Sequence, residues 1–595
     1  MTSFAWFLPE KRRSRRRTAR FAALALAIAL LPASPAASHA MATPAAANAA
    51  PAAADGPVLP APSNPAMDAV AAMQPSTNIG NTLDAIPDET SWGNPLITKA
   101  LFDTYRAQGF HSVRIPVTWD SHSSATAPYL IDSAFLARVK QVADWALSDG
   151  LYVVINVHHD SWEWIANMTT DHDNVLARYD ALWTQIAAEF KNEPRKLLLE
   201  SVNEPQFNGN ATDTQKAQFM NELNGSFVNI VRHSGGRNAT RLLVLPTLGD
   251  TPDQTLMDNL ATEMASLNDP NLVASMHYYS FWPFSVNIAG FTTFNAQTRQ
   301  DLLDTFSRLY NTFISKGVPV YLGEYGLLNY PDYTNPNNNV EPGEALKYFE
   351  LLGYEARINH VTTTLWDAGN YLNRNTLQWR DLTLIDQIKA GWKTRSGTAA
   401  SDLLFVPKSS PITAQTIALN LNGTAFRSLR ADGTNLRKGR DYAVSGDQLT
   451  LTAAALATLV GGRAYGVDAT LEIRFSKGAP WQIHVISNDA PVLSNATGTT
   501  TAFAVPTGFN GDVLATMEAK YDDGTNAGPA GWTSYQQFST AFAPDYPNGA
   551  ISLTPAFFDS LTDGARVTLT FHFWSGALVT YHVTKTGTTV TGTVG

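Results

Sequence analysis

Short apolar runs alternate with amphipathic segments between residues 66 and 398. The runs are five to seven residues long and bounded by polar residues or glycine, as in strands buried on both faces. They are STNIG (76–80), HSVRIPV (111–117), LYVVINV (151–157), LLLESV (197–202), RLLVLP (241–246), NLVASMH (271–277), VPVYLG (318–323) and VTTTLW (361–366). Between them, segments such as 132–150 and 344–358 have helical periodicity, and the first closes at Gly150. Eight strands alternating with helices predict an α/β TIM barrel.

The pattern changes from residue 402 to residue 595, where apolar and polar positions alternate and helical periodicity nearly vanishes. This part contains an internal repeat. QLTLTAAALATL (448–459) matches AISLTPAFFDSL (550–561), and TLEIRFSKGAPWQIHV (470–485) matches TLTFHFWSGALVTYHV (568–583). The repeat spacing of about 100 residues is the size of one β-sandwich. We therefore predict two immunoglobulin-like all-β sandwiches, at 402–493 and 494–595.

The first 65 residues do not fit either pattern. KRRSRRRTAR (11–20) precedes the apolar run FAALALAIALL (21–31), and small residues follow up to Ala40. The apolar run is too short for a membrane anchor, so residues 1–40 are interpreted as a cleaved signal peptide, and the protein as extracellular or periplasmic. The arginine cluster leaves twin-arginine export open beside the general secretory route. Residues 41–65 are rich in Ala and Pro and are predicted to form a linker.

The amino-acid composition excludes several kinds of site and partner. The chain has no cysteine, which excludes disulfides, thiolate nucleophiles and cysteine-based metal sites. The formal charge of −10 argues against a nucleic-acid partner, and no second long apolar run suggests a membrane. We expect a monomer that needs no cofactor.

Ionisable and aromatic residues follow the predicted barrel strands. Catalytic residues of TIM barrels lie at the carboxyl-terminal strand ends. The residues at these positions are Arg114, His158, His159, Asn203, Glu204, His277, Tyr279, Glu324 and Trp366.

Several of these residues also have structural interpretations. Arg114 could form a salt bridge inside the barrel, and Tyr279 and Trp366 could be ordinary barrel aromatics. His158 and His159 suggest a metal site, but neighbours on a strand point to opposite faces and no HExxH spacing exists. We therefore predict no metal.

The two glutamates point to glycoside hydrolysis. Glu is rarely buried without a partner, yet Glu204 and Glu324 each follow an apolar strand. In a retaining glycosidase one carboxylate attacks the anomeric carbon and the other protonates the leaving oxygen, with the groups about 5–5.5 Å apart. Arg114 and Tyr279 are available to keep the nucleophile ionised, and His277 to orient or tune the acid.

The motifs NIGNTLDA, HSVRIPVTW, INVHHDSWEW, ESVNEPQ, SMHYYS, YLGEYG and TLWDAGN, in this order over residues 68–395, resemble glycoside hydrolase family 5. Cellulases and xyloglucanases of subfamily 4 fit best. The resemblance implies that Glu204 is the acid/base and Glu324 the nucleophile. It further implies substrate-binding or positioning roles for Arg114, His158, His159, Asn203, His277, Tyr279 and Trp366, and flanking subsites at Asn78, Trp92, Trp162 and Trp164.

The two sandwiches also resemble known modules. TAQTIALNLNG, GRDYAVSGDQLTLTAAAL and FSKGAPWQIHVI are similar to the X2 module found beside cellulases. The segment from about residue 494 resembles carbohydrate-binding module family 46, which can help to complete a substrate cleft. Trp532 and Trp574 are candidate sugar platforms. Trp574 could instead pack between the sheets, but its place before the turn Ser575-Gly576 favours exposure.

These observations together predict a secreted endo-β-1,4-glucanase acting on cellulose, mixed-linkage β-glucan or xyloglucan. A dedicated xyloglucanase or a mannanase is an alternative, because one barrel supports several specificities. A non-catalytic glycan-binding protein would lack the two carboxylates, and a metal-dependent hydrolase would be inhibited by chelators.

Overall fold

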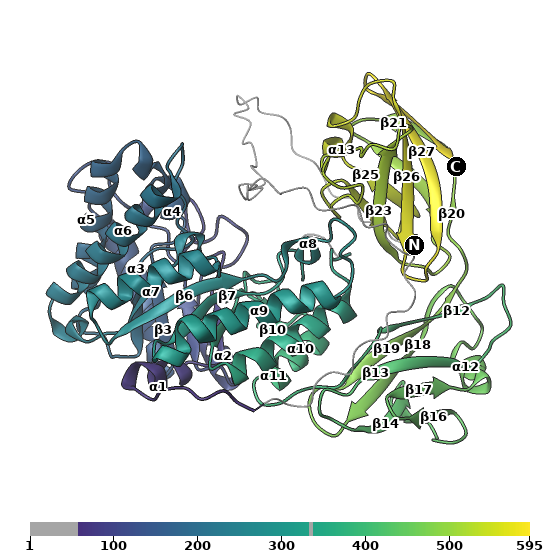
Figure 1. The fold of residues 1–595 in the computed structure, drawn as a ribbon, viewed down its shortest axis with the longest axis horizontal. Helices are drawn as coiled ribbons and strands as arrows, with labels where there is room; N and C mark the ends of the chain where they lie inside the picture. The colour runs from purple at the N-terminus through teal and green to yellow at the C-terminus, as the bar shows by residue number, and fades with distance from the viewer. Residues whose placement is uncertain (1–56, 332–336) are drawn as a thin grey trace, which may run out of the picture. The chain divides into compact units, whose positions relative to one another are not determined.

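The computed structural model describes residues 57–331 and 337–595, and they fall in one compact unit. Eight parallel strands close into a barrel in sequence order, surrounded by helices (Figure 1). The strands are β1 (Ser76–Asn78), β2 (Ser112–Ile115), β3 (Tyr152–Asn156), β4 (Leu197–Glu200), β5 (Leu243–Pro246), β6 (Leu272–Tyr278), β7 (Val320–Tyr325) and β8 (Thr362–Leu365). Each strand pairs with the next, and β8 returns to β1. The predicted TIM barrel is confirmed.

Each of the main barrel helices begins directly after a polar N-cap residue. They are α2 (Lys99–Ala107), α3 (Ser133–Ser148), α5 (His172–Phe190), α6 (Asp213–His233), α7 (Gln254–Leu267), α9 (Ala296–Thr312), α10 (Pro342–Ile358) and α11 (Leu382–Gly391). Asp132 caps α3 by accepting hydrogen bonds from the next turn, and Gly150 follows the helix with φ 77°.

Two sandwiches follow the barrel, as the repeat predicts. The strands of the first are β11 (Thr398–Ala399), β12 (Leu403–Pro407), β13 (Gln415–Asn420), β14 (Phe426–Ala431), β15 (Thr434–Asn435), β16 (Tyr442–Ser445), β17 (Gln448–Leu451), β18 (Gly466–Phe475) and β19 (Trp481–Asn488). Those of the second are β20 (Val492–Leu493), β21 (Ala496–Thr499), β22 (Phe503–Gly508), β23 (Leu514–Tyr521), β24 (Phe542–Asp545), β25 (Ala550–Leu553), β26 (Arg566–Phe573), β27 (Leu578–Thr586) and β28 (Thr589–Val594). Each sandwich has a four-stranded and a five-stranded sheet.

The strand pairings show at which strand each sandwich begins. β11 pairs within the first sandwich and β20 within the second, so each begins a few residues before the positions expected from the sequence. Buried side chains of the barrel and first sandwich form one continuous apolar cluster, and those of the second sandwich form another.

Within the two described ranges, none of the helices combines the length and apolar character that a membrane crossing requires. The expected signal peptide and most of the expected linker lie outside the described residues.

Candidate active site

The carboxyl-terminal rim of the barrel brings together residues from several strands. One carboxylate oxygen of Glu204, one of Glu324 and a ring nitrogen of His277 lie within 4.8 Å of one another. Arg114 from β2 and Tyr279, just after β6, complete the cluster. The strand ends thus position two carboxylates, a cation, an imidazole and a phenol around one point.

Glu324 accepts two short hydrogen bonds. Arg114 Nη1 donates to Oε1 at 2.8 Å and the Tyr279 hydroxyl donates to Oε2 at 2.6 Å. Burial and the charge of Glu324 raise the pKa of Tyr279 well above its ordinary value, so the phenol keeps its hydrogen and remains a donor. Both contacts favour the ionised form of Glu324.

A bulge in β7 aims Glu324 into the barrel mouth. The pairing of β6 with β7 skips Gly323, placing Leu322 opposite Met276 and Glu324 opposite His277. A Cβ atom at position 323 would lie 3.1 Å from the Nε2 atom of His277. A side chain at position 323 would therefore crowd the imidazole, and glycine leaves room for the close approach of His277.

Arg114 is wholly buried and makes a complete set of hydrogen bonds. Nε and Nη2 donate to Glu200 at 2.7 and 2.8 Å, Nη2 donates to Asn203 at 2.7 Å, and Nη1 donates to Asn78 at 3.0 Å. Asn78 is fully buried, and its amide also donates to backbone carbonyls. Its position therefore differs from the expected one, because Asn78 lies beneath Arg114 rather than at a flanking subsite.

Glu204 has a left-handed backbone, with φ 41°. Its amide donates to the Oδ2 atom of Asp250 at 2.7 Å, and its Oε1 atom lies 2.8 Å from the Nδ1 atom of His277. The side chain remains 29% exposed, compared with 6% for that of Glu324, so Glu204 is the carboxyl that an entering ligand can reach directly.

The pKa shifts of Glu204 and Glu324 have the reverse of the directions expected for an acid and a nucleophile. Burial raises the pKa of Glu204, but the hydrogen bond and charge of His277 outweigh it, and the pKa lies below its ordinary value. Burial and the neighbouring Glu204 raise the pKa of Glu324, although His277 and Arg114 oppose them. Burial lowers the pKa of His277, but Asp250 and the two glutamates raise it to about 9. At neutral pH these pKa shifts favour a protonated His277 and an ionised Glu204.

His158 and Trp366 form one wall of the site. Their rings are stacked, with centroids 5.9 Å apart and an interplanar angle of 7°. Burial lowers the pKa of His158 well below its ordinary value, so this imidazole is neutral. Gly80 leaves the space that Trp366 occupies, since a Cβ atom there would lie 2.9 Å from the indole.

The expectation that His158 and His159 point to opposite faces is wrong. Both lie beyond the end of β3, and their ring centroids are 4.4 Å apart. One ligand atom of each, with one of Asp84, lies within a 4.8 Å group, so side-chain direction does not argue against a cation there. This group contains a single carboxylate, and the absence of a metal stays a prediction.

The tryptophans expected at flanking subsites differ in exposure. Trp162 stacks on His159 at 3.9 Å, and Trp92 lies 5.1 Å from the same ring; they are 38% and 36% exposed. Trp164 is buried, with its indole nitrogen donating to Asp160 at 2.9 Å. Trp92 and Trp162 can therefore contact a ligand, whereas Trp164 packs within the protein.

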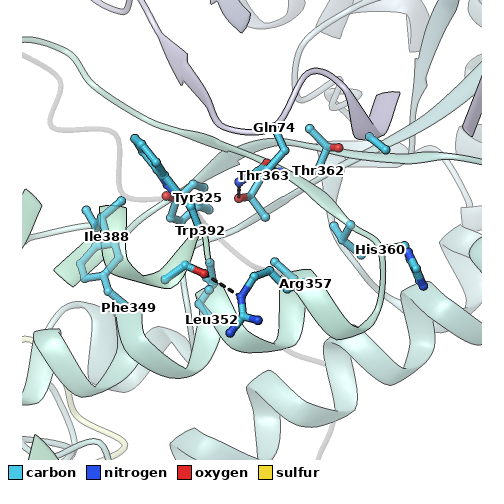
Figure 2. A pocket seen from close by; sticks show the side chains of 15 residues that line it. Gln74, Tyr325, Phe349, Leu352, Arg357, His360, Thr362, Thr363, Ile388 and Trp392 are labelled. Carbon is cyan, nitrogen blue, oxygen red and sulfur yellow. Dashed lines mark hydrogen bonds between the residues drawn. The ribbon is translucent and has the colours of Figure 1, made fainter. Parts of the chain in front are cut away.

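A cavity of about 370 Å³ adjoins the catalytic cluster. Tyr279 and Trp366 line it together with the segment after β7 and the segment after β8. Figure 2 shows a different cavity, of about 180 Å³, between the start of β8, α10 and α11. It is lined by Thr362 and Thr363 at the amino-terminal end of β8, and none of Arg114, Glu204, His277, Tyr279 and Glu324 lines it.

The second sandwich contacts the loop after β6. Asn287 donates to the carbonyl of Ala515 at 3.0 Å and accepts from the amide of Phe538 at 3.1 Å. Trp532 is 61% exposed, with its ring centroid 6.5 Å from that of Trp282 in helix α8 (Trp282–Ser285). Trp574 is half-buried but does not belong to the apolar core of this sandwich.

Three family descriptions match the chain in tandem. "Cellulase (glycosyl hydrolase family 5)" matches residues 76–372, "Carbohydrate binding domain X2" matches 399–485, and the carbohydrate-binding domain CBM46 matches 489–593. Endoglucanase B of Paenibacillus lautus is 51% identical over 537 residues, covering 90% of this chain and 94% of the relative. The chain belongs to glycosyl hydrolase family 5.

Solved structures agree with this family 5 assignment. The tri-modular endo-beta-1,4-glucanase B of Bacillus halodurans is 42% identical with a TM-score of 0.87, covering 90% of this chain and 100% of that one. A trimodular endoglucanase of subfamily 4 is 46% identical with a TM-score of 0.86, covering 89% and 99%. The expected resemblance to family 5 and to both appended modules is confirmed.

Two residues of this family 5 site were missed by sequence reasoning. Glu200 is the charged member of the apolar run LLLESV, and a charge in a doubly buried strand requires a partner. Asp250 follows β5, a strand whose end offered no candidate, although rim position alone would have pointed to it.

Proposed function

We propose that this family 5 glycoside hydrolase is a secreted, retaining endo-β-1,4-glucanase that acts on cellulose, mixed-linkage β-glucan or xyloglucan. The observation that carries the proposal is the carboxylate spacing: oxygens of Glu204 and Glu324 lie within 4.8 Å of each other. Retaining glycosidases have carboxyl groups about 5–5.5 Å apart, while inverting enzymes need roughly 6.5–9.5 Å to admit a water molecule. The names of the similar proteins support the endo-glucanase assignment.

In this proposal Glu324 is the nucleophile. An Oε atom attacks the anomeric carbon while the bond to the leaving glycosidic oxygen breaks, and the carboxylate becomes a glycosyl ester. Arg114 and Tyr279 hold both oxygens of Glu324 in place. As the ester forms, negative charge leaves Glu324, and its former hydrogen-bond donors support carboxylate departure in the second step.

Glu204 is the acid and then the base. When a sugar covers the exposed side of Glu204, loss of water favours its neutral form, and the proton of His277 can pass from Nδ1 to Oε1 across their 2.8 Å contact. Glu204 then protonates the leaving oxygen. In the second step it removes a proton from the water that attacks the glycosyl ester, which restores both carboxyl groups.

The chemistry test uses azide and an activated aryl cellobioside. With Glu204→Ala, azide should attack the glycosyl-enzyme and give a product of retained configuration. With Glu324→Ala, azide should take the place of the nucleophile and give the inverted product. Glu263→Gln, which changes a buried carboxyl in α7, is the matched control and should form no glycosyl azide. If Glu204→Ala gave the inverted azide and Glu324→Ala the retained one, Glu204 would be the nucleophile and Glu324 the acid/base.

Within this proposal the second sandwich contributes a sugar platform at Trp532. The support is its exposure and its proximity to Trp282 on the barrel. Initial rates on carboxymethyl-cellulose, lichenan, xyloglucan and mannan decide between a general glucanase, a dedicated xyloglucanase and a mannanase. Binding without hydrolysis of any of them would instead identify a glycan-binding protein, and inhibition by chelators would identify a metal-dependent enzyme.

Secretion is supported by the basic and apolar segments of the first 31 residues. Expression of the full chain in a bacterial host should release a protein whose amino terminus lies near residue 41. A cell-retained protein that still begins at residue 1 would contradict this part of the proposal.

A further inference from the structure

Asp250 is a buried carboxylate beside the acid/base pair to which the reaction assigns no role. It follows β5 in a short 3-10 turn and is completely inaccessible to solvent. Two successive left-handed residues, Gly249 with φ 63° and Asp250 with φ 50°, turn this side chain into the barrel mouth. Positive φ is uncommon outside glycine, although aspartate tolerates it better than most residues, and such conformations are concentrated at functional sites.

The turn is tied directly to the loop that carries Glu204. Asp250 Oδ2 accepts the amide hydrogen of Glu204 at 2.7 Å, and the amide of Gly249 donates to the carbonyl of Pro205 at 2.8 Å. These two hydrogen bonds hold the backbone of Glu204 and of Pro205. Since Glu204 is itself left-handed, the hydrogen bond to Asp250 helps to hold a backbone that would otherwise relax.

Asp250 also faces the imidazole that contacts Glu204. Its Oδ2 atom lies 3.8 Å from Nε2 of His277, while Nδ1 of the same ring lies 2.8 Å from Glu204. Within the described chain, the Nε2 atom of His277 and the Oδ1 atom of Asp250 are buried and have no hydrogen-bond partner. The imidazole therefore lies between Glu204 on its Nδ1 side and Asp250 on its Nε2 side, and a carboxylate oxygen of Glu200 also lies within 4.8 Å of the ring and of Asp250.

We propose that Asp250 is a positioning residue for Glu204, which fixes its backbone amide and, through His277, places the imidazole hydrogen on Nε2 whenever Glu204 carries the catalytic proton. This inference rests on the proposed function. In that state Nδ1 of His277 is the acceptor for the Glu204 hydroxyl. When the proton returns to Nδ1, the N–H bond forms, the O–H bond breaks, and the resulting imidazolium lies between the carboxylates of Asp250 and Glu204.

The charge of Asp250 has a predictable effect on the shared proton. The His277–Glu204 pair is neutral with its proton and negative without it. A nearby carboxylate disfavours the negative state and so raises the pH at which the pair loses its proton. Burial raises the pKa of Asp250 to about 7, so Asp250 is ionised where His277 titrates, near pH 9. The charged or titratable groups around His277 are Glu200, Glu204, Asp250, Glu324, Arg114 and His158.

Asp250→Asn separates the two roles of this residue. The amide oxygen can still accept the Glu204 amide hydrogen, but the negative charge is lost. We expect the basic limb of the kcat/KM profile on carboxymethyl-cellulose to move down by about one pH unit, with kcat reduced and KM little changed. Asp250→Glu keeps the charge and should retain the basic limb. Glu263→Gln, a buried carboxyl outside this group, should leave the profile unchanged.

An Asp250→Asn profile that coincides with that of the wild type would overturn the proposal, even if the melting temperature falls. If this variant does not fold, the protonation state of His277 is measured in the wild-type protein by ¹⁵N NMR of the histidine rings. The His277 signals are assigned by their absence from the spectrum of His277→Gln. His277 should remain protonated to about pH 9. A neutral His277 at pH 7 would refute the inference. Lack of hydrolysis by the wild type would instead refute the proposed function.

Discussion

The hydrogen bond from Tyr279 to Glu324 should set the acid limb of the activity profile. The hydroxyl donates to Oε2 at 2.6 Å, in a site where Glu324 is only 4% exposed. A hydrogen bond to a charged group contributes about 1.5–3 kcal/mol, and a tenfold change in an ionisation constant corresponds to about 1.36 kcal/mol. The bond therefore favours the ionised form of Glu324 by about tenfold to a hundredfold.

Tyr279→Phe removes this bond and little else. The ionised form of Glu324 loses a donor, so its pKa rises and the acid limb of kcat/KM moves to higher pH by about one to two pH units. On the acidic side, where the rate follows the ionised fraction, activity at a fixed pH should fall roughly tenfold to a hundredfold. The assay is the initial rate on carboxymethyl-cellulose measured across the pH range, with thermal unfolding measured in parallel.

Tyr278→Phe is the matched control. The neighbouring phenol donates to Asp301 at 2.8 Å and points away from the reacting carboxylates. The Tyr278→Phe substitution should lower the free energy of unfolding without moving the acid limb of the kcat/KM profile. If Tyr279→Phe leaves the acid limb in place, or if Tyr278→Phe shifts it equally, then the Tyr279 hydroxyl does not control the ionisation of Glu324.

Three further changes test other parts of the structure. Glu200→Gln removes one charge of a buried pair and should lower the free energy of unfolding by about 3 kcal/mol; unchanged denaturant unfolding would contradict the role given to Arg114. Trp532→Ala should raise KM on polymer roughly fivefold, equivalent to about 1 kcal/mol, but not on a short oligosaccharide, with exposed Tyr465→Ala as control. Burial raises the pKa of Glu263 to about 8, so its contribution to stability is present below its unfolded value and lost as pH rises toward 8. Glu263→Gln should therefore remove much of the difference in unfolding free energy between pH 5 and pH 8. If the wild type and the variant show the same pH dependence, the Glu263 carboxyl is not protonated in the folded protein.

The sequence alone determined the barrel, the two sandwiches and the identity of both catalytic candidates. A strand buried on both faces must be apolar along its length, so each strand and its polar end are visible in the residue pattern. Because parallel strands end at one rim, Arg114, Glu204 and Glu324 could be placed together although they are 210 residues apart at the extremes. The internal repeat indicated the two sandwiches for a similar reason, because the same alternation of apolar and polar residues occurs in both halves of the carboxyl-terminal part.

Only the tertiary structure decided which of the candidate residues are buried and which partners they have. Asn78 and Trp164 have the residue types of a binding site, but burial removes them from the cleft, and no local pattern encodes that. Glu200 and Asp250 acquire their importance from partners distant in the sequence, Arg114 on β2 and Glu204 after β4. Whether Glu204 or His277 carries their shared proton depends on the distances of the imidazole from Asp250 and Glu324. A carboxyl's pKa follows from such distances rather than from its neighbours in the chain.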